Sequence, residues 1–324
     1  MKLLIDGNNL AYRANATTEL TTKQGERVSA IFGTLQMIQS YLKESEGKYK
    51  NKMLDSLRLF YKNPELLFND VVTCWDAGKS KQRMTLFPEY KANRKKEDRT
   101  EEEKAIYAQF IDQMEQLHKV LPVFGIRSVK VKGWEGDDLI YVASQLTDDV
   151  CVIVSTDKDM LQLVSDKVLV WSPFKEKLIT PSNFQAETGL PQESYLHYRT
   201  LVGDSSDNIN GVKGIGEKTG TTLLLKYKDI TGLIAAKDEL MKSKRTQKIF
   251  EDLSLLDRNN ELMNLRKVDY TDVKDYVLEQ MEKSTSFQDK NVKMFLASKQ
   301  FVKILSDYLM WSMPFRMLGM DENE

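Results

Sequence analysis

The chain has 324 residues, which is enough for one large domain or two smaller ones. A hydrophobic fraction of 41% and a charged fraction of 29% are ordinary for a globular protein, and the net charge of -1 points to no class of partner. With two cysteines and two histidines, the composition excludes a disulfide framework and a histidine-rich metal site.

The sequence shows no N-terminal targeting pattern and no apolar run of membrane-spanning length. We therefore expect a cytosolic protein, located in the host cytoplasm if a phage encodes it. Cys74 and Cys151 each lie in an apolar, strand-like run, and we expect both to be reduced thiols in the core.

In the first half of the chain, short apolar runs alternate with longer segments of helical periodicity. Strands are expected at residues 2–5, 71–75, 128–131, 151–155 and 168–171. Helices are expected at residues 29–42, 101–121 and 137–146, and a polar loop at 43–52. This alternation predicts an α/β domain with a mainly parallel sheet.

After about Pro181 the strand signal fades. Helical segments interrupted by Gly and Asp are expected at residues 193–202, 217–226 and 249–256. The architecture should therefore change near residue 180.

Acidic residues follow several of the predicted strands. In a parallel sheet the carboxyl ends of the strands share one edge, where ligand sites form. We expect seven carboxylates at that edge: Asp6, Asp76, Glu135, Asp137, Asp138, Asp157 and Asp159. Asp204 and Asp207, in the helical part of the chain, are candidates to join them.

Such a cluster requires neutralisation, because carboxylates a few ångströms apart repel one another. Oxygen ligands favour hard divalent cations, with Mg²⁺ expected here and Mn²⁺ as a substitute. Two such ions about 4 Å apart form the usual arrangement for in-line phosphoryl displacement. The alternative for any single Asp is a helix N-cap, which explains the recurrence after successive strands less well.

Residues 79–104 are rich in bases, with Phe87 and Tyr90 interleaved. The bases are Lys79, Lys81, Arg83, Lys91, Arg94, Lys95, Lys96, Arg99 and Lys104. A basic segment directly after the Asp76 strand suits attraction of a nucleic-acid backbone, with Tyr90 stacking on a base. A solvated loop balanced by its own acids is the alternative.

The glycine-rich segment 211–219 lies between two helical segments. It fits neither a dinucleotide fingerprint nor a P-loop, because the glycine order is wrong and Glu217 interrupts the Gly-Lys-Thr run. It fits a helix–hairpin–helix turn, whose backbone N–H groups bind DNA phosphates. The residues expected at the DNA are Gly211, Lys213, Gly214, Ile215, Gly216, Lys218 and Thr219. A tight turn without a ligand is the alternative.

Five segments, in this order, resemble the 5′-nuclease or flap-endonuclease superfamily, specifically bacteriophage (RNase H-like) and bacterial 5′→3′ exonucleases. They are residues 4–9, 134–138, 155–159, 203–208 and 211–219. The resemblance implies a PIN-like sheet flanked by helices, a helix–three-turn–helix DNA-binding region and a helical arch for the 5′ strand. It also implies that Tyr90, Lys91 and Arg94 approach the scissile phosphate, and that a K⁺ ion can bind at the hairpin.

The resemblance divides the nine acids between two metal ions. It assigns to the first ion Asp6, Asp76, Glu135, Asp137 and Asp138. It assigns to the second ion Asp157, Asp159, Asp204 and Asp207. We expect a PIN-like catalytic domain at 1–180 with its arch at about 79–104, a DNA-binding region at 181–265 and a helical extension at 266–324.

The expected activity is Mg²⁺-dependent hydrolysis of 5′ flaps, 5′ ends and RNA–DNA hybrids by a monomer, in DNA replication or repair. The alternatives are a non-catalytic DNA-binding replication factor and a PIN-type ribonuclease acting on single-stranded RNA. Segment 44–70 looks like an insertion without an assigned role. The tail 295–320, rich in Met and aromatic residues, is expected to pack against the body, with binding of a replication protein, such as a single-strand-binding protein, as the alternative.

Overall fold

The structure is a computed structural model that describes residues 1–17, 19–94 and 100–318. Its centre is a six-stranded sheet with the order β3-β2-β1-β4-β5-β6. The strands are β1 (Lys2–Asp6), β2 (Asp70–Trp75), β3 (Arg127–Lys130), β4 (Cys151–Val154), β5 (Val168–Ser172) and β6 (Lys177–Ile179). All neighbours pair in parallel except β5 and β6, so the predicted α/β class is confirmed.

The five predicted strands lie within one residue of their expected bounds, whereas β6 was not predicted. It spans three residues and pairs antiparallel with β5 across a short turn, which leaves little periodicity to recognise. After β6 the described chain is helical apart from a two-residue pair, β7 (Gly203–Asp204) and β8 (Ile209–Asn210). This agrees with the change of architecture expected near residue 180.

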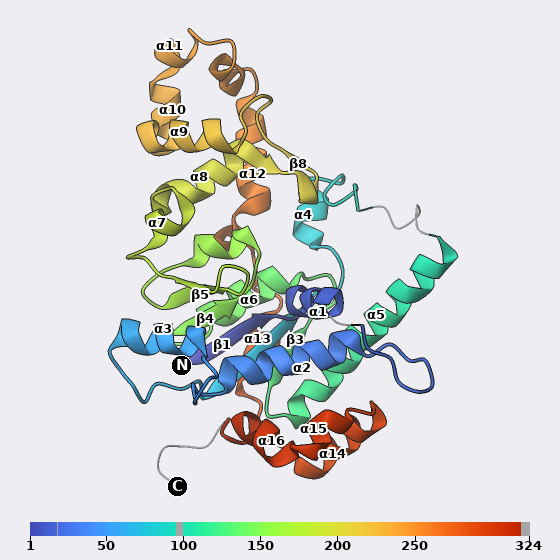
Figure 1. Ribbon diagram of the computed structural model, residues 1–324. Helices are drawn as coiled ribbons and strands as arrows, with labels where there is room; N and C mark the ends of the chain where they lie inside the picture. Colours follow the sequence, from blue (N-terminus) through green and yellow to red (C-terminus); the bar gives the residue numbers. More distant parts are fainter. Residues whose placement is uncertain (18, 95–99, 319–324) are drawn as a thin grey trace.

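Alternate side chains of the strands enter two cores, because successive residues of a strand face opposite sides of the sheet. Leu3 and Ile5 of β1 belong to one core and Leu4 belongs to the other. The helices of the first half are α1 (Gly7–Thr17), α2 (Ser29–Leu42), α3 (Lys52–Tyr61), α4 (Lys81–Leu86), α5 (Glu101–Val120) and α6 (Gly136–Gln145). Helices α2 and α5 cover the first core and α6 the second (Figure 1).

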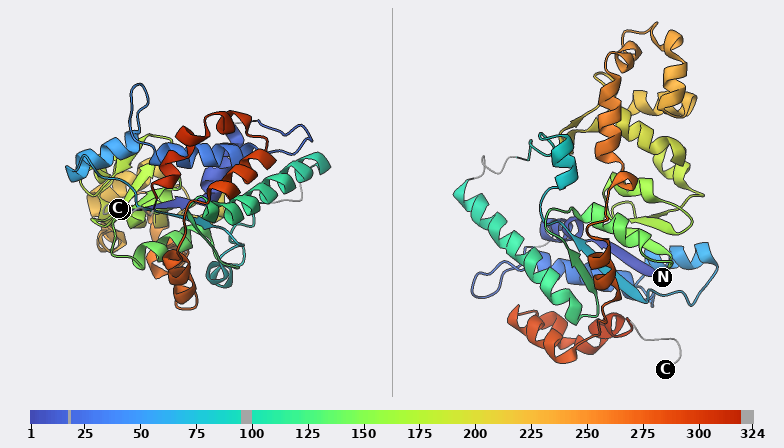
Figure 2. Two further views of the ribbon diagram at one scale, coloured as in Figure 1. Left: turned by 90° about the horizontal axis from the view of Figure 1, so that it is seen from below. Right: turned by 180° about the vertical axis from the view of Figure 1, so that it is seen from behind.

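The helices beyond the sheet form two separate regions, one above it and one below it in Figure 1. The upper region contains α7 (Phe184–Thr188), α8 (Gln192–Val202), α9 (Glu217–Tyr227), α10 (Ile230–Ala235), α11 (Lys237–Leu240) and α12 (Leu253–Met263). Helix α13 (Lys274–Glu282) then leads past β3 and α6 to the lower region, as the view from behind shows (Figure 2). The lower region contains α14 (Asp289–Ser298), α15 (Val302–Ser306) and α16 (Tyr308–Arg316).

The tail packs against the body, as predicted, within the described residues up to 318. Phe315 and Phe124 are fully buried with ring centroids 5.3 Å apart, and Trp311 lies against both. The last residues of the predicted tail, 319 and 320, lie outside the described residues.

The segment 44–70 contributes a helix to the core. Its helix α3 buries Met53, Leu54 and Leu57 in the first core, and Lys52 forms an ion pair with Glu176 in the turn before β6. Cys74 and Cys151 are buried free thiols, as expected. Among the described residues, we find no helix both long enough and apolar enough to cross a membrane.

Candidate active site

The first carboxylates lie where the central strands end. Asp6 is the last residue of β1, and its Oδ1 accepts a hydrogen bond from the Asn9 backbone N at 2.9 Å. Asp76 follows β2, and its Oδ1 accepts from the Gly136 N at 2.6 Å. A Cβ on Gly136 would lie 3.1 Å from that oxygen, so glycine leaves room for this close approach of the two segments.

Three acids gather at the N-terminus of α6. Carboxylate oxygens of Glu135, Asp137 and Asp138 lie within 4.8 Å of one another, which is close enough for one metal ion. Glu135 and Asp138 are buried, and the helix N-terminus favours negative charge. Glu135 occupies the N-cap position but makes no side-chain capping bond, so capping alone does not explain its presence.

The pKa values show how poorly these charges are tolerated without a cation. Burial raises the pKa of Asp6 to about 8, and the nearby Asp76, Asp157 and Asp137 carboxylates add to the increase. Burial also raises the pKa of Asp138 to about 7, against the opposing effect of Arg83. An oxygen-only, mutually repelling set of this kind fits a hard divalent cation, so the residues present suit the expected metal.

The second group of acids lies beside the first, on the loop after β4 and at the β7–β8 turn. Asp157 and Asp204 each cap a short 3₁₀ helix, by accepting hydrogen bonds from the backbone N atoms of Asp159 and Ser206 at 2.8 Å. The capping alternative is therefore partly right. Capping uses only Oδ1 of Asp157, so it does not exclude metal binding by that residue. In Asp204 the second oxygen pairs with Arg199.

Arg199 of α8 connects two acids of this second group. Sequence analysis did not select it. Its Nη2 lies 2.8 Å from Asp159 Oδ1 and 2.7 Å from Asp204 Oδ2. Hydrogen bonds from Ser206 and Arg199 hold the pKa of Asp204 below its ordinary value, although burial opposes them. The only sequence signal was a base five positions before Asp204, which is too common a pattern to single out.

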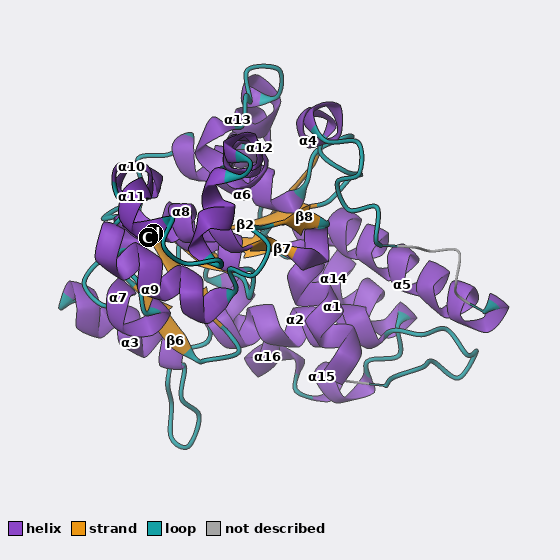
Figure 3. Cartoon of the chain, turned by 90° about the horizontal axis from the view of Figure 1, so that it is seen from above, coloured by secondary structure: helices purple, strands orange, loops and turns teal. Residues whose placement is uncertain are grey.

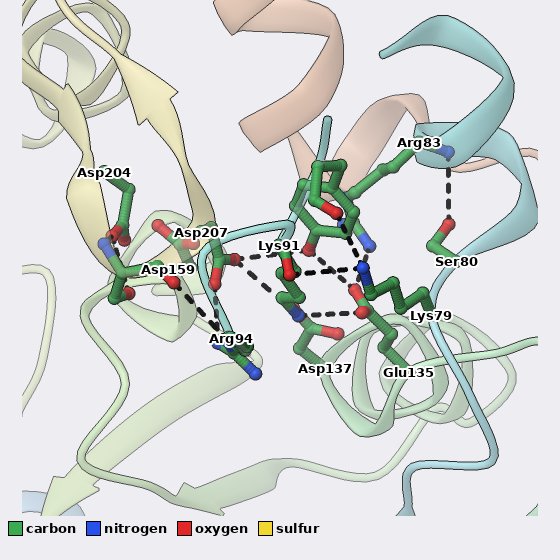
Figure 4. Close-up of polar contacts among 12 residues, drawn as sticks. Lys79, Ser80, Arg83, Lys91, Arg94, Glu135, Asp137, Asp159, Asp204 and Asp207 are labelled. Carbon is green, nitrogen blue, oxygen red and sulfur yellow. Dashed lines mark hydrogen bonds and ion pairs between the residues drawn. The ribbon is translucent and has the colours of Figure 1, made fainter. Parts of the chain in front are cut away.

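The basic segment lies directly on the acids (Figure 4). Lys91 Nζ donates to Glu135 Oε1 at 2.7 Å and lies 3.7 Å from Asp207 Oδ2. Arg94 Nη2 donates to Asp207 Oδ1 at 2.6 Å. Lys91 thus contacts an acid from each of the two groups, and Arg94 joins it at Asp207.

Tyr90 is placed differently from the prediction. Its hydroxyl donates to Glu135 Oε2 at 2.8 Å and lies 3.2 Å from Asp207 Oδ2. The residue is 2% exposed, and it packs with Leu262, Met263 and Ile209 in a small core. The prediction that Tyr90 stacks on a base does not fit this arrangement, since the ring faces protein.

The predicted arch is described only in part. The described ends of the arch are the short helix α4 and the start of α5. A capping box between Thr100 and Glu103 stabilises the N-terminus of α5. Residues 87–94 form turns, and Asn93 Nδ2 and Asn208 Nδ2 tie this stretch to the β7–β8 turn. Residues 95–99, and with them Lys95, Lys96 and Arg99, lie outside the described residues.

The glycine-rich segment runs from the end of β8 through a turn into the first residues of α9, two elements that Figure 3 shows from above. Gly214 has φ +86°, a conformation that favours glycine. Val212 and Ile215 are buried, whereas Lys213, Gly216 and Lys218 are exposed. A Cβ on Gly216 would meet nothing within 4 Å, so the N-terminus of α9 is open to a ligand.

A cleft of about 550 Å³ joins the acids to this turn. It is lined by Asp137, Asp157, Asp204 and Asp207 from the two acid groups, by Lys91, and by Gly216 and Glu217 at the turn. A larger cleft, of about 1370 Å³, borders Asp157 on the other side and extends along Tyr12 and Arg13 of α1 to Lys218. Four of the nine acids and the turn therefore face the same cleft.

This combination of sheet, acidic rim and hairpin defines a nuclease of the 5′-nuclease class. The N-terminal resolvase-like domain of 5′-3′ exonucleases matches residues 1–189, and the C-terminal SAM fold of 5′-3′ exonucleases matches residues 190–285. The chain belongs to the 5′-3′ exonuclease family, as the sequence motifs suggested.

Curated relatives support this assignment. The 5′-3′ exonuclease of Buchnera aphidicola subsp. Schizaphis graminum is 31% identical over 71% of this chain and 72% of its own length. That of Aquifex aeolicus is 27% identical over 87% of this chain and 92% of its own length. The thermostable DNA polymerase I of Thermus thermophilus is 32% identical over 82% of this chain, but the match spans 28% of that polymerase.

Solved structures share the fold. A bacteriophage T5 protein co-crystallised with metal ions superposes with a TM-score of 0.65 and 25% identity, over 86% of this chain and 97% of that chain. A T5 flap endonuclease in a complex with DNA and metal ions superposes with a TM-score of 0.62 and 23% identity, over 92% of this chain and 99% of that chain. Both of these T5 structures contain metal ions, and the second also contains DNA.

Proposed function

We propose that the chain is a Mg²⁺-dependent, structure-specific 5′ nuclease that hydrolyses DNA flaps, 5′ ends and the RNA of RNA–DNA primers during phage-type DNA replication or repair. The observation that carries the proposal is the convergence of nine acids on one rim, with the basic segment and the hairpin beside them. Two divalent ions, for which Mn²⁺ would substitute, would activate water and stabilise the leaving oxygen of the phosphodiester.

The ligands proposed for the two ions are those assigned from the family motifs. The pKa values support a divalent site, because Asp6, Asp76, Asp138 and Asp159 are all raised above the ordinary aspartate value, chiefly by burial. Both oxygens of Asp138 accept hydrogen bonds from the single guanidinium of Arg83.

Lys91 and Arg94 are proposed to act on the scissile phosphate. Both already contact Asp207, and Lys91 also contacts Glu135, so a phosphate held at the metals would lie within reach of their positive charges. Positive groups held in place stabilise the charge that develops on a transferred phosphoryl group. Tyr90 would support them by orienting Glu135 and Asp207 through its hydroxyl.

The hairpin is proposed to hold duplex DNA through its backbone. Lys213 and Lys218 are exposed beside the open N-terminus of α9, a combination that suits phosphate binding. A K⁺ ion held by hairpin carbonyls belongs to the same proposal. Because the cleft runs from this turn to the acids, cleavage should fall near the junction between duplex and single strand.

The deciding experiment is cleavage of a labelled 5′-flap substrate with Mg²⁺, by the wild type and by Asp137→Asn. Asp137 is one of the three acids at the N-terminus of α6, so its replacement should reduce cleavage by at least a hundredfold. Losing a group that stabilises the transition state electrostatically typically has an effect of about this size. Asp148→Asn is the matched control, since Asp148 is an exposed acid in an ion pair with Lys167. Unchanged turnover in Asp137→Asn would reject the site.

The same assay separates the alternatives. A wild type that binds flap DNA without cutting it would be a non-catalytic DNA-binding factor. Faster cleavage of single-stranded RNA than of flaps would indicate a PIN-type ribonuclease. A flap series with RNA or DNA in the 5′ strand measures the preference between them, and sedimentation tests the expected monomer.

A further inference from the structure

Arg83 is a buried arginine at the centre of the site that the proposed mechanism does not use. Its Nη1 and Nη2 donate to Asp138 Oδ2 and Oδ1 at 2.8 and 2.7 Å, so the guanidinium binds both oxygens of that carboxylate. Nη1 also donates to Glu135 Oε2 at 3.0 Å, and Nε donates to the Leu262 carbonyl at 2.8 Å. The side chain is 7% exposed.

These four hydrogen bonds join three separate parts of the chain. Arg83 belongs to α4, at the start of the basic segment, while its partners lie at the start of α6 and near the end of α12. Close by, Lys79 Nζ donates to the carbonyls of Tyr90 and Lys91 at 3.0 and 3.1 Å (Figure 4). Arg83 therefore anchors the start of the basic segment to the α6 acids, while Lys79 holds the Tyr90–Lys91 part of the same segment.

Asp138 differs from Asp137 and Glu135 in that a single guanidinium holds both of its oxygens. The Glu135 oxygens accept from three side chains, one of which, Lys91, lines the open cleft. Each Asp138 oxygen accepts a charged hydrogen bond from Arg83, and the residue is 1% exposed. Asp137, by contrast, is partly exposed and lines the open cleft. By distance Asp138 could bind the same metal ion as Glu135 and Asp137. However, it is buried away from the open cleft, and the permanent positive charge of Arg83 already balances its own charge.

We propose that Arg83 is a positioning residue that holds Asp138 as an orienting group behind Glu135, so that Glu135 and Asp137, and not Asp138, face the metal. The inference rests on the proposed function, and it reassigns Asp138 from direct ligand to support. Groups of this kind fix the geometry of the ligands that they contact, and losing one typically costs 10–100-fold in metal affinity.

The chemistry requires arginine. A lysine has one ammonium on a flexible stem and cannot bind both Asp138 oxygens while also reaching the Leu262 carbonyl. That buried carbonyl would lose its charged donor. Arg83→Lys keeps the positive charge but removes the planar guanidinium that binds both Asp138 oxygens. It therefore tests the positioning of Asp138 separately from the charge at residue 83.

A double-mutant cycle of Arg83→Gln and Asp138→Asn tests the proposal without any cleavage. Mn²⁺ binding to the DNA-free protein is measured by calorimetry, and thermal unfolding is measured in EDTA. Each single change should weaken Mn²⁺ binding about tenfold, and the double variant should bind within about threefold of the weaker single variant. The losses in Tm should likewise not add, because both changes remove the same contact.

Arg127→Met is the matched control. Arg127 forms a partly buried ion pair with Asp70 at the start of β2, the opposite end of that strand from Asp76. This variant should lower Tm without changing Mn²⁺ affinity.

Arg83→Lys should keep the KM for flap DNA within about threefold, lower kcat and leave the Tm in EDTA below that of the wild type.

Additive losses, about a hundredfold in Mn²⁺ affinity for the double variant, would make Asp138 an independent ligand and overturn the proposal. Wild-type kcat and Tm in Arg83→Lys would overturn it as well, since charge alone would then suffice. If Arg83→Gln does not fold, the near-isosteric Asp138→Asn paired with Arg83→Lys completes the cycle. A wild type that fails to cut flaps would reject the proposed function but leave this coupling measurable.

Discussion

Lys91 has a backbone φ of +54°, a left-handed conformation that is uncommon for a residue with a side chain. The surroundings maintain it, because its N donates to the Asp207 carbonyl at 2.9 Å and its carbonyl accepts from Lys79. Unusual backbone geometry of this kind tends to occur at functional sites, where neighbouring contacts hold it. Here it directs the ammonium toward Glu135.

Lys91→Ala should slow flap cleavage about a hundredfold while changing the Kd for duplex DNA by less than about threefold. The reason is that Lys91 contacts the acids, whereas the hairpin holds the duplex. Single-turnover cleavage and equilibrium binding give the two numbers. Lys119→Ala is the control, since Lys119 is exposed at the far end of α5. A variant that loses binding but keeps its cleavage rate would contradict the catalytic role.

Asp6 makes the stability of the metal-free protein depend on pH. Its folded pKa of about 8 lies above the ordinary value of 3.8, so folding with Asp6 ionised is unfavourable. Because the folded state binds more protons than the unfolded state between these values, this contribution to stability is lost as pH rises from about 4 to about 8. Mg²⁺ should restore stability, most strongly at the upper end of that range.

Asp6→Asn should therefore be more stable than the wild type at pH 8 in EDTA, and should gain less stability from Mg²⁺. Urea unfolding at pH 5 and pH 8, with and without Mg²⁺, measures both effects. Asp148→Asn should follow the wild type, because Asp148 is exposed. Equal Mg²⁺ stabilisation of the wild type and Asp6→Asn would show that Asp6 does not contribute to the metal site.

The acids could be found from the sequence because strand ends are visible as apolar runs and parallel strands share an edge. Arg83 and Arg199 could not be assigned roles, although Arg83 was noted among the bases. Their partners lie 52 and 55 positions away for Arg83, and 40 and 5 for Arg199. Such pairings depend on how segments far apart in the sequence pack together, and the hydrophobic periodicity of one sequence carries no information about that packing.

At the scale of elements, the helix predicted at 249–256 was wrong in its bounds. The structure has a 3₁₀ helix at Thr246–Phe250 and then α12 from Leu253, separated by Glu251 and Asp252. Asp252 accepts a hydrogen bond from the Leu255 N at 3.2 Å and so begins a new helix. The cap signal was present in the sequence, but apolar residues on both sides obscured it.

The hairpin should account for much of the duplex affinity. Lys213→Ala combined with Lys218→Ala should weaken duplex binding and reduce the slope of log K against log salt by about 2, if each lysine contacts one phosphate. Lys226→Ala on the same helix, where Lys226 pairs with Glu239, is the control. A slope unchanged from the wild type would mean that the duplex binds elsewhere.

At the scale of the molecule, the lower helices complete the core beneath the sheet. Replacing Phe315 by Ala should cost about 3–5 kcal/mol, since the ring is fully buried against Phe124 and Trp311. Met313→Ala, at a residue that is 54% exposed, should cost less than about 0.5 kcal/mol. Denaturant unfolding compares the two, and similar losses would argue against a tightly packed tail.

The same packing has a consequence during synthesis. Gln39 Nε2 donates to the Trp311 carbonyl across 272 positions, and α2 shares its core with α16. At about 5–20 residues per second, a ribosome needs on the order of tens of seconds to make the intervening chain. During that interval the part of α2 that packs against α16 has no cover, so newly made chains are open to chaperones and to aggregation until α16 emerges.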